Sequence, residues 1–381
     1  MINCINSSFE SVSSKEWIVT NGIGGYASSS ICGANTRRYH GLLVASFNPP
    51  TDRRVIISKV EETITVHDEE FFISSNQYPD VIHPHGYQWL RSFQRDPMPC
   101  AVFASENFSI SKTVFMIYGS NTTVIEYVNN GDTSFKLSLN PLCVYRDYHH
   151  LFQENKQFDF SCRHDDNGKI TVSPKIGVPA FYIHAPGGQF NAKPDWYRNF
   201  EYSQEEERGL DYREDAFSIG PIQYELAPAE KKYLILSTED NLSDGSPASW
   251  KAYEKLRLRE LVNGMEDPFL RDLMISGDQF LVWRLSSRSH TLIAGYHWFT
   301  DWGRDTMIAM RGLIIATGKK QIAESIFRTF LKYLSKGMIP NRFPDEGEEP
   351  EYNTIDATLW LFVALYEFHR KFDDIEFIRS V

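Results

Sequence analysis

The chain has 381 residues, 42% of them hydrophobic and 14% aromatic, a composition typical of a globular protein with room for two or three domains. Its formal net charge is −11 and no Lys/Arg cluster stands out, which argues against nucleic acid as a partner because phosphate backbones are bound through local basic density. The five cysteines are scattered without CxxC spacing, so the sequence predicts neither a disulfide framework nor a thiolate zinc site.

The sequence also lacks the signals of membrane insertion and export. No segment reaches about 18 continuous apolar residues, and the N-terminal stretch has no basic region followed by an apolar run. We therefore expect no membrane partner and a cytoplasmic location.

From about residue 15 to 237 the chain is a series of short, often alternating runs rich in Val, Ile, Thr, Tyr and Phe. Turn signals such as Asn130-Gly131 and Asn167-Gly168 separate these runs, as in antiparallel hairpins. The pattern predicts a large β-sandwich. The clearest runs are residues 54–73, 108–119, 123–142, 169–174, 181–185 and 231–238.

After Leu242 the periodicity becomes helical. A polar turn and a charged helical pattern end at Gly264, and a further helix is predicted to begin with Asp267 as its cap and Pro268 at its first position. Apolar residues at spacings of three and four then predict helices over 306–316, 320–334 and 354–371. We expect a β-sandwich domain over 1–242, a helical linker over 243–266 and helices of a further domain over 267–381.

The stretch GYHWFTDWGRDTMIAM, residues 295–310, places two carboxylates, an arginine and two tryptophans within nine residues. In the simpler interpretation Asp301 or Asp305 caps the following helix and Arg304 pairs with a carboxylate. In the functional interpretation Trp298, Trp302 and Met307 shield Asp305 from water, so that it can act as a general acid.

A second polar segment, GMIPNRFPDEGEEPEYNTIDATLW, spans residues 337–360. It is either a solvated acidic loop with Asn353 or Thr354 capping the next helix, or a site that binds sugar hydroxyls through amide and carboxylate groups beside aromatic rings. No His is interleaved and no EF-hand spacing occurs, which disfavours a metal site. The candidate binding residues are Asn341, Arg342, Asp345, Glu346, Asn353 and Asp356.

These two segments together resemble the start of the helical catalytic domain of glycogen debranching enzymes of the bacterial and archaeal type, the amylo-α-1,6-glucosidases. Upstream, EWIVTNGIGGYASSSICGANTRRYHGLLVA and WYRNFEYSQEEERGLDYREDAF resemble parts of the N-terminal domain of that family. Several motifs occur in the same order, and the resemblance touches most of residues 15–370.

The resemblance implies a β-sandwich packed on an (α/α)6 barrel, without a cofactor, that hydrolyses α-1,6-linked glucose on glycogen or a similar branched glucan, with inversion. The Asp of the WGRD motif, here Asp305, would be the general acid. The glucose site would contain the six residues of the second segment together with Trp298, Asp301, Trp302 and Arg304. We also expect Arg304 to point at a carboxylate other than Asp305, or at sugar hydroxyls, because an adjacent cation would favour the ionised acid.

An (α/α)6 barrel has twelve helices, which takes about 300 residues. The stretch from Asp267 to Val381 holds about a third of that, and the Glu that acts as general base in the family has no counterpart in it. We therefore expect an incomplete barrel and a chain that is inactive alone, because one carboxylate cannot both protonate the leaving oxygen and activate water.

The segment RRYHGLL, residues 37–43, has two interpretations. It is a turn into a strand with Tyr39 and His40 packed on the sheet, or Arg38, Tyr39 and His40 help to shape the sugar site. Two other functions also stay open for the whole protein. One is a glucoamylase-like exo-glycosidase of different linkage preference, and the other is a non-catalytic glucan-binding protein.

Overall fold

The computed structural model describes residues 1–242, 244–343 and 350–381. The chain divides into two units, here called the sandwich unit and the helical unit. Two short N-terminal segments belong to the helical unit, so the division does not follow a single cut in the sequence. The sandwich unit is 1–21, 26–45 and 54–255, and the helical unit is 22–25, 46–53 and 256–381.

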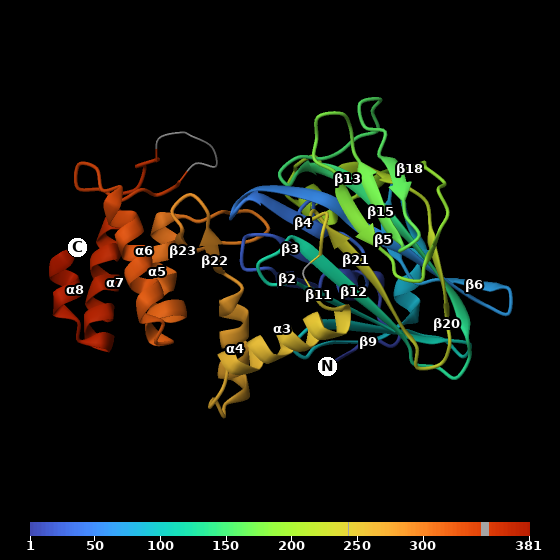
Figure 1. The fold of residues 1–381 in the computed structure, drawn as a ribbon, viewed down its shortest axis with the longest axis horizontal. Coiled ribbons are helices and arrows are strands. Elements are labelled where there is room, and N and C mark those ends of the chain that lie inside the picture. Colours follow the sequence, from blue (N-terminus) through green and yellow to red (C-terminus); the bar gives the residue numbers. More distant parts are fainter. Residues whose placement is uncertain (243, 344–349) are drawn as a thin grey trace. The chain divides into compact units, whose positions relative to one another are not determined.

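The first sheet of the described chain has nine antiparallel strands. The strands of the sandwich unit run from blue through green to yellow in Figure 1. Its strands come from both ends of the sandwich sequence, since β12 pairs with β21. In sheet order they are β1 (Ile2–Asn3), β9 (Leu90–Arg95), β10 (Pro99–Ala104), β11 (Ser109–Met116), β12 (Thr122–Asn129), β21 (Lys231–Ser237), β16 (Phe181–His184), β15 (Lys169–Ser173) and β14 (Ser161–His164).

The second sheet has ten strands within the described residues and is also antiparallel. The main path is β17 (Gln189–Phe190), β20 (Ile222–Leu226), β13 (Phe135–Asp147), β5 (Thr51–Val66), β4 (Gly41–Asn48), β3 (Tyr26–Ser30) and β2 (Glu16–Thr20). Off this path, β19 (Arg213–Ser218) pairs with β13 and β18 (Asp195–Glu201), and β6 (Glu69–Phe72) pairs with β5. The smaller elements are the hairpin β7 (Ser75–Tyr78) and β8 (Val81–His85), the 3-10 turn Gly86–Trp89, α1 (Phe9–Ser13) and α2 (Ser203–Glu207).

Alternation along the strands builds the core between the two sheets. In β13, Phe135, Leu137 and Leu139 are buried, whereas Ser138 and Asn140 are only partly buried. Strands β10 and β11 of the first sheet contact β2 and β3 of the second, so the apolar faces are enclosed. The predicted antiparallel β domain is therefore confirmed.

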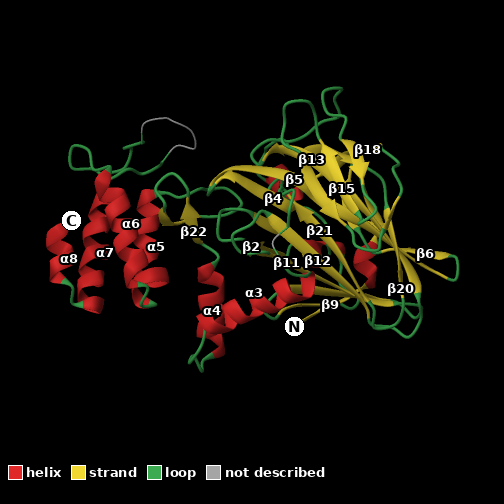
Figure 2. Cartoon of the chain, in the orientation of Figure 1, coloured by secondary structure: helices red, strands yellow, loops and turns green. Residues whose placement is uncertain are grey.

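Helices follow the strands, as predicted (Figure 2). Helix α4 has the predicted start, because the Asp267 carboxylate accepts the N–H of Phe269 at 2.8 Å. Residues Met307, Phe327, Phe330 and Phe368 lie in the core of the helical unit. The helices are α3 (Pro247–Leu261), α4 (Pro268–Asp278), α5 (Gly303–Met310), the π-helical segment η2 (Arg311–Ala316), α6 (Lys320–Lys332), α7 (Asp356–Phe372) and α8 (Ile375–Ser380).

One element differs from the expected helical periodicity after Asp267. Strands β22 (Leu281–Arg284) and β23 (Ser289–Leu292) form a hairpin, with Arg288 in the left-handed region at φ 48°. The runs LVWR and SHTL are too short for a stable helix, and the polar turn between them lets them pair.

Helix α7 is apolar on two sides. Leu361, Ala364 and Phe368 are buried, whereas Phe362 is 65% exposed and Tyr366 60% exposed. A helix that is apolar all round is typical of a helix enclosed by neighbours. In the described parts of the chain, no helix combines the length and apolar character needed to cross a membrane.

Candidate active site

Asp305 lies in the first turn of α5, which begins at Gly303. The residue before the helix, Trp302, has an extended backbone and makes no side-chain cap. Neither Asp301 nor Asp305 therefore caps α5, and the capping interpretation is wrong for both. Asp305 is the third residue of the helix.

The Asp305 side chain is exposed, which differs from the predicted shielding. The reason is helical spacing: Gly303, Thr306, Met307 and Met310 form the buried side of α5, so Met307 faces the core instead of covering the carboxylate. Within the described residues, no hydrogen bond or ion pair engages the Asp305 carboxylate.

Gly303 brings the two polar segments of the sequence together. A Cβ at this position would lie 2.0 Å from the carbonyl oxygen of Pro340, so only glycine permits the approach. The Gly303 N–H donates to the carbonyl of Asn341 at 2.8 Å, and Trp302 pairs with Arg342 in an antiparallel bridge. The WGRD motif and residues 340–342 therefore lie side by side.

Asn341 is the centre of this junction. Its N–H donates to the carbonyl of Glu351 at 2.8 Å, and its Nδ2 donates to Asn353 Oδ1 at 2.8 Å. The side chain is 3% exposed, and no described residue donates to its Oδ1. Arg342 pairs with Glu351 at 3.2 Å. The two amides and the arginine thus lie close to one another.

Arg304 is held by a carboxylate other than Asp305, which confirms the prediction for its direction. Its Nε lies 3.1 Å from Oδ2 of Asp356, the first residue of α7. The second carboxylate oxygen of Asp356 accepts the hydroxyl of Thr354 at 2.8 Å. The Thr354 hydroxyl in turn accepts the N–H of Ala357 at 3.3 Å and so satisfies a donor of the first turn.

Asp301 does not belong to the exposed site. It is 0% exposed, and Arg284 Nη1 donates to both of its carboxylate oxygens, at 2.6 and 2.5 Å. Burial raises the pKa of Asp301, and the positive charge of Arg284 opposes that rise. The Arg284 guanidinium also lies 4.9 Å from the ring centre of Phe343. The expectation that Asp301 contacts sugar is corrected, because a buried and fully engaged carboxylate cannot reach a ligand.

The aromatic residues before α5 form a connected group. Phe299 lies between Trp298 and Trp302, with ring centres 6.4 and 5.7 Å away. The buried Arg53 donates to the carbonyl of Tyr296 at 2.8 Å and also to that of Phe299. Arg53 thus fixes the turn that carries both tryptophans.

Two predicted site residues, Asp345 and Glu346, lie outside the described residues. Among the residues that the structure does describe, no group of three or more His, Cys, Asp and Glu side chains could hold a metal ion.

Tyr39 and His40 are buried in the sandwich unit. The Tyr39 hydroxyl lies 3.1 Å from Nδ1 of His149. The His40 Nδ1 accepts the N–H of Thr36 at 3.1 Å, and its Nε2 lies 3.4 Å from Glu16 Oε1. This is the arrangement expected for a turn into a strand with both rings packed on the sheet.

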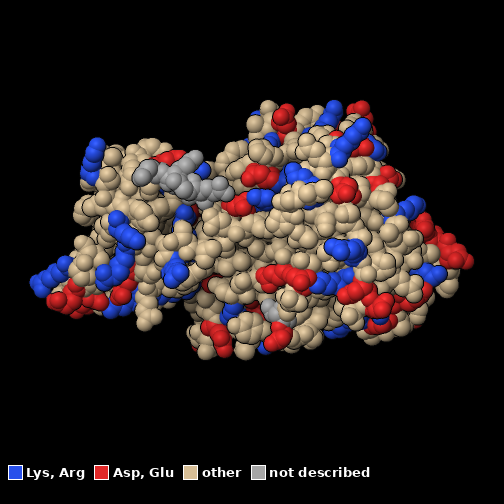
Figure 3. Space-filling view, turned by 45° about the horizontal axis from the view of Figure 1, so that its top comes forward, with Lys and Arg blue, Asp and Glu red and all other residues tan. Residues whose placement is uncertain are grey.

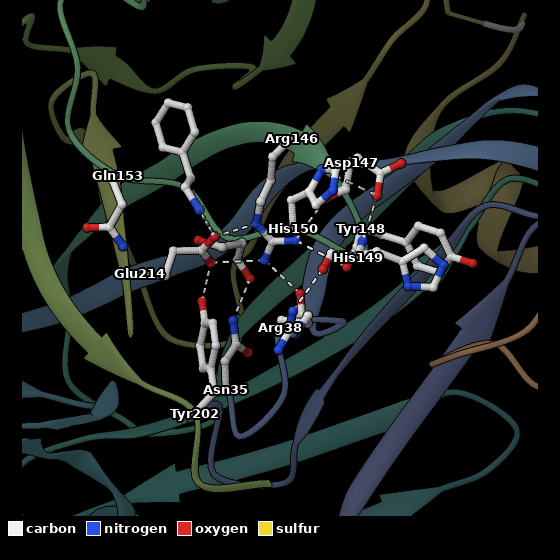
Figure 4. Close-up of polar contacts among 12 residues, drawn as sticks. Asn35, Arg38, Arg146, Asp147, Tyr148, His149, His150, Gln153, Tyr202 and Glu214 are labelled. Atoms are coloured by element: carbon white, nitrogen blue, oxygen red, sulfur yellow. Dashed lines mark hydrogen bonds and ion pairs between the residues drawn. The ribbon is translucent and has the colours of Figure 1, made fainter. Parts of the chain in front are cut away.

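Arg38 belongs to the polar network drawn in Figure 4. It donates to the carbonyls of His149 at 2.8 Å and Asp211 at 2.7 Å, and its own carbonyl accepts from Arg146 Nη2 at 2.6 Å. Arg146 also pairs with the buried Glu214. These contacts join strands and loops of the sandwich unit.

The fold and the candidate site indicate a class of enzyme, and comparisons with known families then identify the family. An antiparallel β domain followed by helices, with an exposed carboxylate beside tryptophans, amides and an arginine, agrees with a glycoside hydrolase. Residues 15–233 match the family described as "Glycogen debranching enzyme N terminal", and residues 275–381 match "Amylo-alpha-1,6-glucosidase". The chain belongs to the glycogen debranching enzyme family.

A stretch of 62 residues is 42% identical to the glycogen debranching enzyme of Saccharomyces cerevisiae. This stretch is 16% of the chain and 4% of the yeast enzyme, so the chain matches a small part of that relative.

A solved structure of a bacterial glucoamylase shows a likeness in fold. A bacterial glucoamylase in complex with acarbose has a TM-score of 0.50 at 12% identity, covering 94% of this chain and 54% of the glucoamylase. A GH92 family glycosyl hydrolase has a TM-score of 0.36 at 9% identity, covering 91% of this chain and 49% of the hydrolase. At 12% identity the glucoamylase likeness concerns the fold alone.

Proposed function

We propose that the protein removes α-1,6-linked glucose from branched α-glucans, with Asp305 as the general acid. One observation carries the assignment: the Asp305 carboxylate is exposed and makes no hydrogen bond or ion pair with the described residues. By contrast, Asp301 is buried and paired with Arg284, and Asp356 is paired with Arg304. Membership of the debranching enzyme family supports the linkage.

In the proposed reaction, Asp305 donates its proton to the glycosidic oxygen as the bond to the anomeric carbon breaks. Arg304 pairs with Asp356, so its charge is directed to a group other than the acid. Arg342 and Asn353 supply donors and acceptors for sugar hydroxyls, and the buried Asn341 holds Asn353 in place. Trp298 and Trp302 supply apolar surface for the ring.

The proposal includes inversion at the anomeric carbon. An inverting hydrolase uses a second carboxylate, roughly 6.5 to 9.5 Å from the acid, to activate water. In this proposal the base is a carboxylate on a later helix of an (α/α)6 barrel. The exposed apolar side of α7, with Phe362 and Tyr366, suits a helix that barrel neighbours enclose.

The test is hydrolysis by the full-length gene product. Glycogen limit dextrin and linear maltooligosaccharides are offered separately, and NMR follows the anomer of glucose that first appears. The proposal predicts glucose from limit dextrin, little from linear chains, and β-glucose as the first product. Preferred release from linear chains would indicate a glucoamylase-like enzyme, and binding without any release would indicate a glucan-binding protein.

A further inference from the structure

The outward face of the second sheet carries a second concave site, in the sandwich unit. In β13 and β5, Ser138 pairs in register with Thr63, and Asn140 pairs with Glu61. All four side chains are partly buried and lie opposite the apolar core side of their strands. They form the polar floor of a hollow of about 340 Å³.

Two tyrosines form a wall of this hollow. Tyr78 ends β7, and Tyr197 lies on β18, two elements that contact each other. Both rings pack against the buried Phe200, with centres 5.0 Å from Tyr78 and 6.4 Å from Tyr197, the latter nearly parallel at 8°. The shared support of Phe200 holds both tyrosines in place before any ligand arrives.

The polar groups of the hollow are fixed by neighbours. Lys59 lies 2.9 Å from Glu61 Oε1, and Asn76 Nδ2 donates to the same oxygen at 3.1 Å. Asn140 Nδ2 donates to the Tyr197 hydroxyl at 3.2 Å. Burial raises the pKa of Tyr197 and the negative charge of Glu61 adds to the rise, so this phenol stays neutral and able to donate.

This chemistry fits a neutral, polyhydroxylated ligand. The charged residues that line the hollow include two carboxylates, Glu61 and Asp195, and one cation, Lys193. None of the described lining residues is an arginine, and this balance of charge disfavours phosphates and other anions as ligands. Aromatic walls with amide, hydroxyl and carboxylate groups are typical of a small-molecule site, and the volume is near the lower end of such sites.

We propose that the hollow binds a glucosyl unit of an α-glucan chain, as a carbohydrate site formed by the sandwich unit alone. The choice of glucan rests on the proposed function, whereas the preference for a neutral sugar rests on the hollow itself. Such a site would hold the polymer while branch ends are processed, so it should matter for glycogen and not for a short oligosaccharide.

The experiment compares Tyr197→Ala with the parent in the full-length gene product. Affinity electrophoresis in gels with increasing glycogen gives the Kd for the polymer, and a short branched oligosaccharide gives kcat/KM. The expected result is a Kd for glycogen raised at least about tenfold, with kcat/KM on the short substrate within about twofold of the parent. Tyr253→Ala, which removes a 64% exposed tyrosine of α3 in the same unit, is the matched control and should change neither.

Tyr197→Phe keeps the ring on Phe200 and removes only the hydroxyl that accepts from Asn140, so it decides the question if Tyr197→Ala melts early. We expect it to weaken glycogen retention about threefold at an unchanged melting temperature. The inference would be overturned if glycogen retained the folded variants Tyr197→Phe and Tyr197→Ala as strongly as the parent. It would also be overturned if glycogen did not retain the parent. A parent that is retained but hydrolyses nothing would instead contradict the proposed function.

Discussion

The Arg304 guanidinium lies 3.1 Å from the Asp356 carboxylate, so the cation adjacent to Asp305 in the sequence is engaged by the first residue of α7. Both side chains are partly exposed, at 53% and 37%, and such a pair contributes little to stability. The pair sets the orientation of the Arg304 side chain, because it holds the guanidinium charge away from the Asp305 carboxylate.

Asp356→Asn should therefore change catalysis more than stability. Without its partner, Arg304 can turn toward Asp305, and a nearby cation favours the ionised carboxylate that cannot donate a proton. We expect hydrolysis to fall about tenfold and the alkaline limb of the pH–rate profile to move to lower pH. The double variant Arg304→Gln/Asp356→Asn should recover the parent's pH profile. A parent-like profile in the single variant would contradict the role of the pair.

Gly303 is a steric requirement of the site, and Gly312 provides its control. A Cβ at Gly303 meets the carbonyl oxygen of Pro340, whereas a Cβ at Gly312 has no neighbour within 4 Å. Gly303→Ala should lower the free energy of unfolding by at least about 2 kcal/mol and reduce activity, because α5 must shift. Gly312→Ala should be neutral or stabilise by up to about 1 kcal/mol. Urea unfolding measures both, and equal effects would show that the Pro340 contact does not matter.

Asp301 should behave as a structural residue. Asp301→Ala leaves Arg284 buried without its carboxylate, which costs about 3 to 5 kcal/mol in unfolding free energy. Arg342→Ala breaks the half-exposed pair with Glu351 and should cost about 1 kcal/mol or less. A nearly unchanged stability of Asp301→Ala, with a raised KM for the glucan, would restore Asp301 to the sugar site.

Glu16 gives a pH dependence to the sandwich unit. Burial alone would raise its pKa, but hydrogen bonds and charges of His40 and Arg37 lower the pKa of Glu16 to about 2, from 4.5. The folded state thus keeps this carboxylate ionised when the unfolded chain binds a proton, so its stabilisation is present above pH 4.5 and is lost as the pH falls toward 2.

Glu16→Gln should consequently flatten the stability curve in this window. Urea midpoints between about pH 6 and about pH 3 should fall less steeply in the variant than in the parent. Glu106→Gln, at an exposed loop position, controls for the loss of one acidic residue and should keep the parent's slope. A Glu16→Gln slope equal to that of the parent would refute the contribution.

Regular periodicity made much of the fold predictable. The strand runs between residues 54 and 238, the Asp267 cap and the helices after residue 306 follow from local alternation, spacing and capping. The β22 to β23 hairpin was missed because short apolar runs fit a strand and a buried helix equally well.

The site was predictable where one segment carries the chemistry and unpredictable where partners are distant. Arg53 supports Tyr296 from 243 residues away, and nothing in its local sequence indicates that contact. Arg284 pairs with Asp301 across a hairpin, so the burial of that carboxylate follows from tertiary structure. The exposure of Asp305 depends on where α5 begins, and Gly303 and the Pro340 contact set that position.

The most direct test of the central claim is the rate of glucose release from limit dextrin by Asp305→Asn in the full-length gene product. The account predicts a loss of at least about a hundredfold, with an unchanged melting temperature and unchanged glycogen binding. An activated aryl glucoside, whose leaving group needs little help from a proton, should lose least. A rate within a few-fold of the parent, or a lower melting temperature as the only change, would contradict the assignment of Asp305 as the general acid.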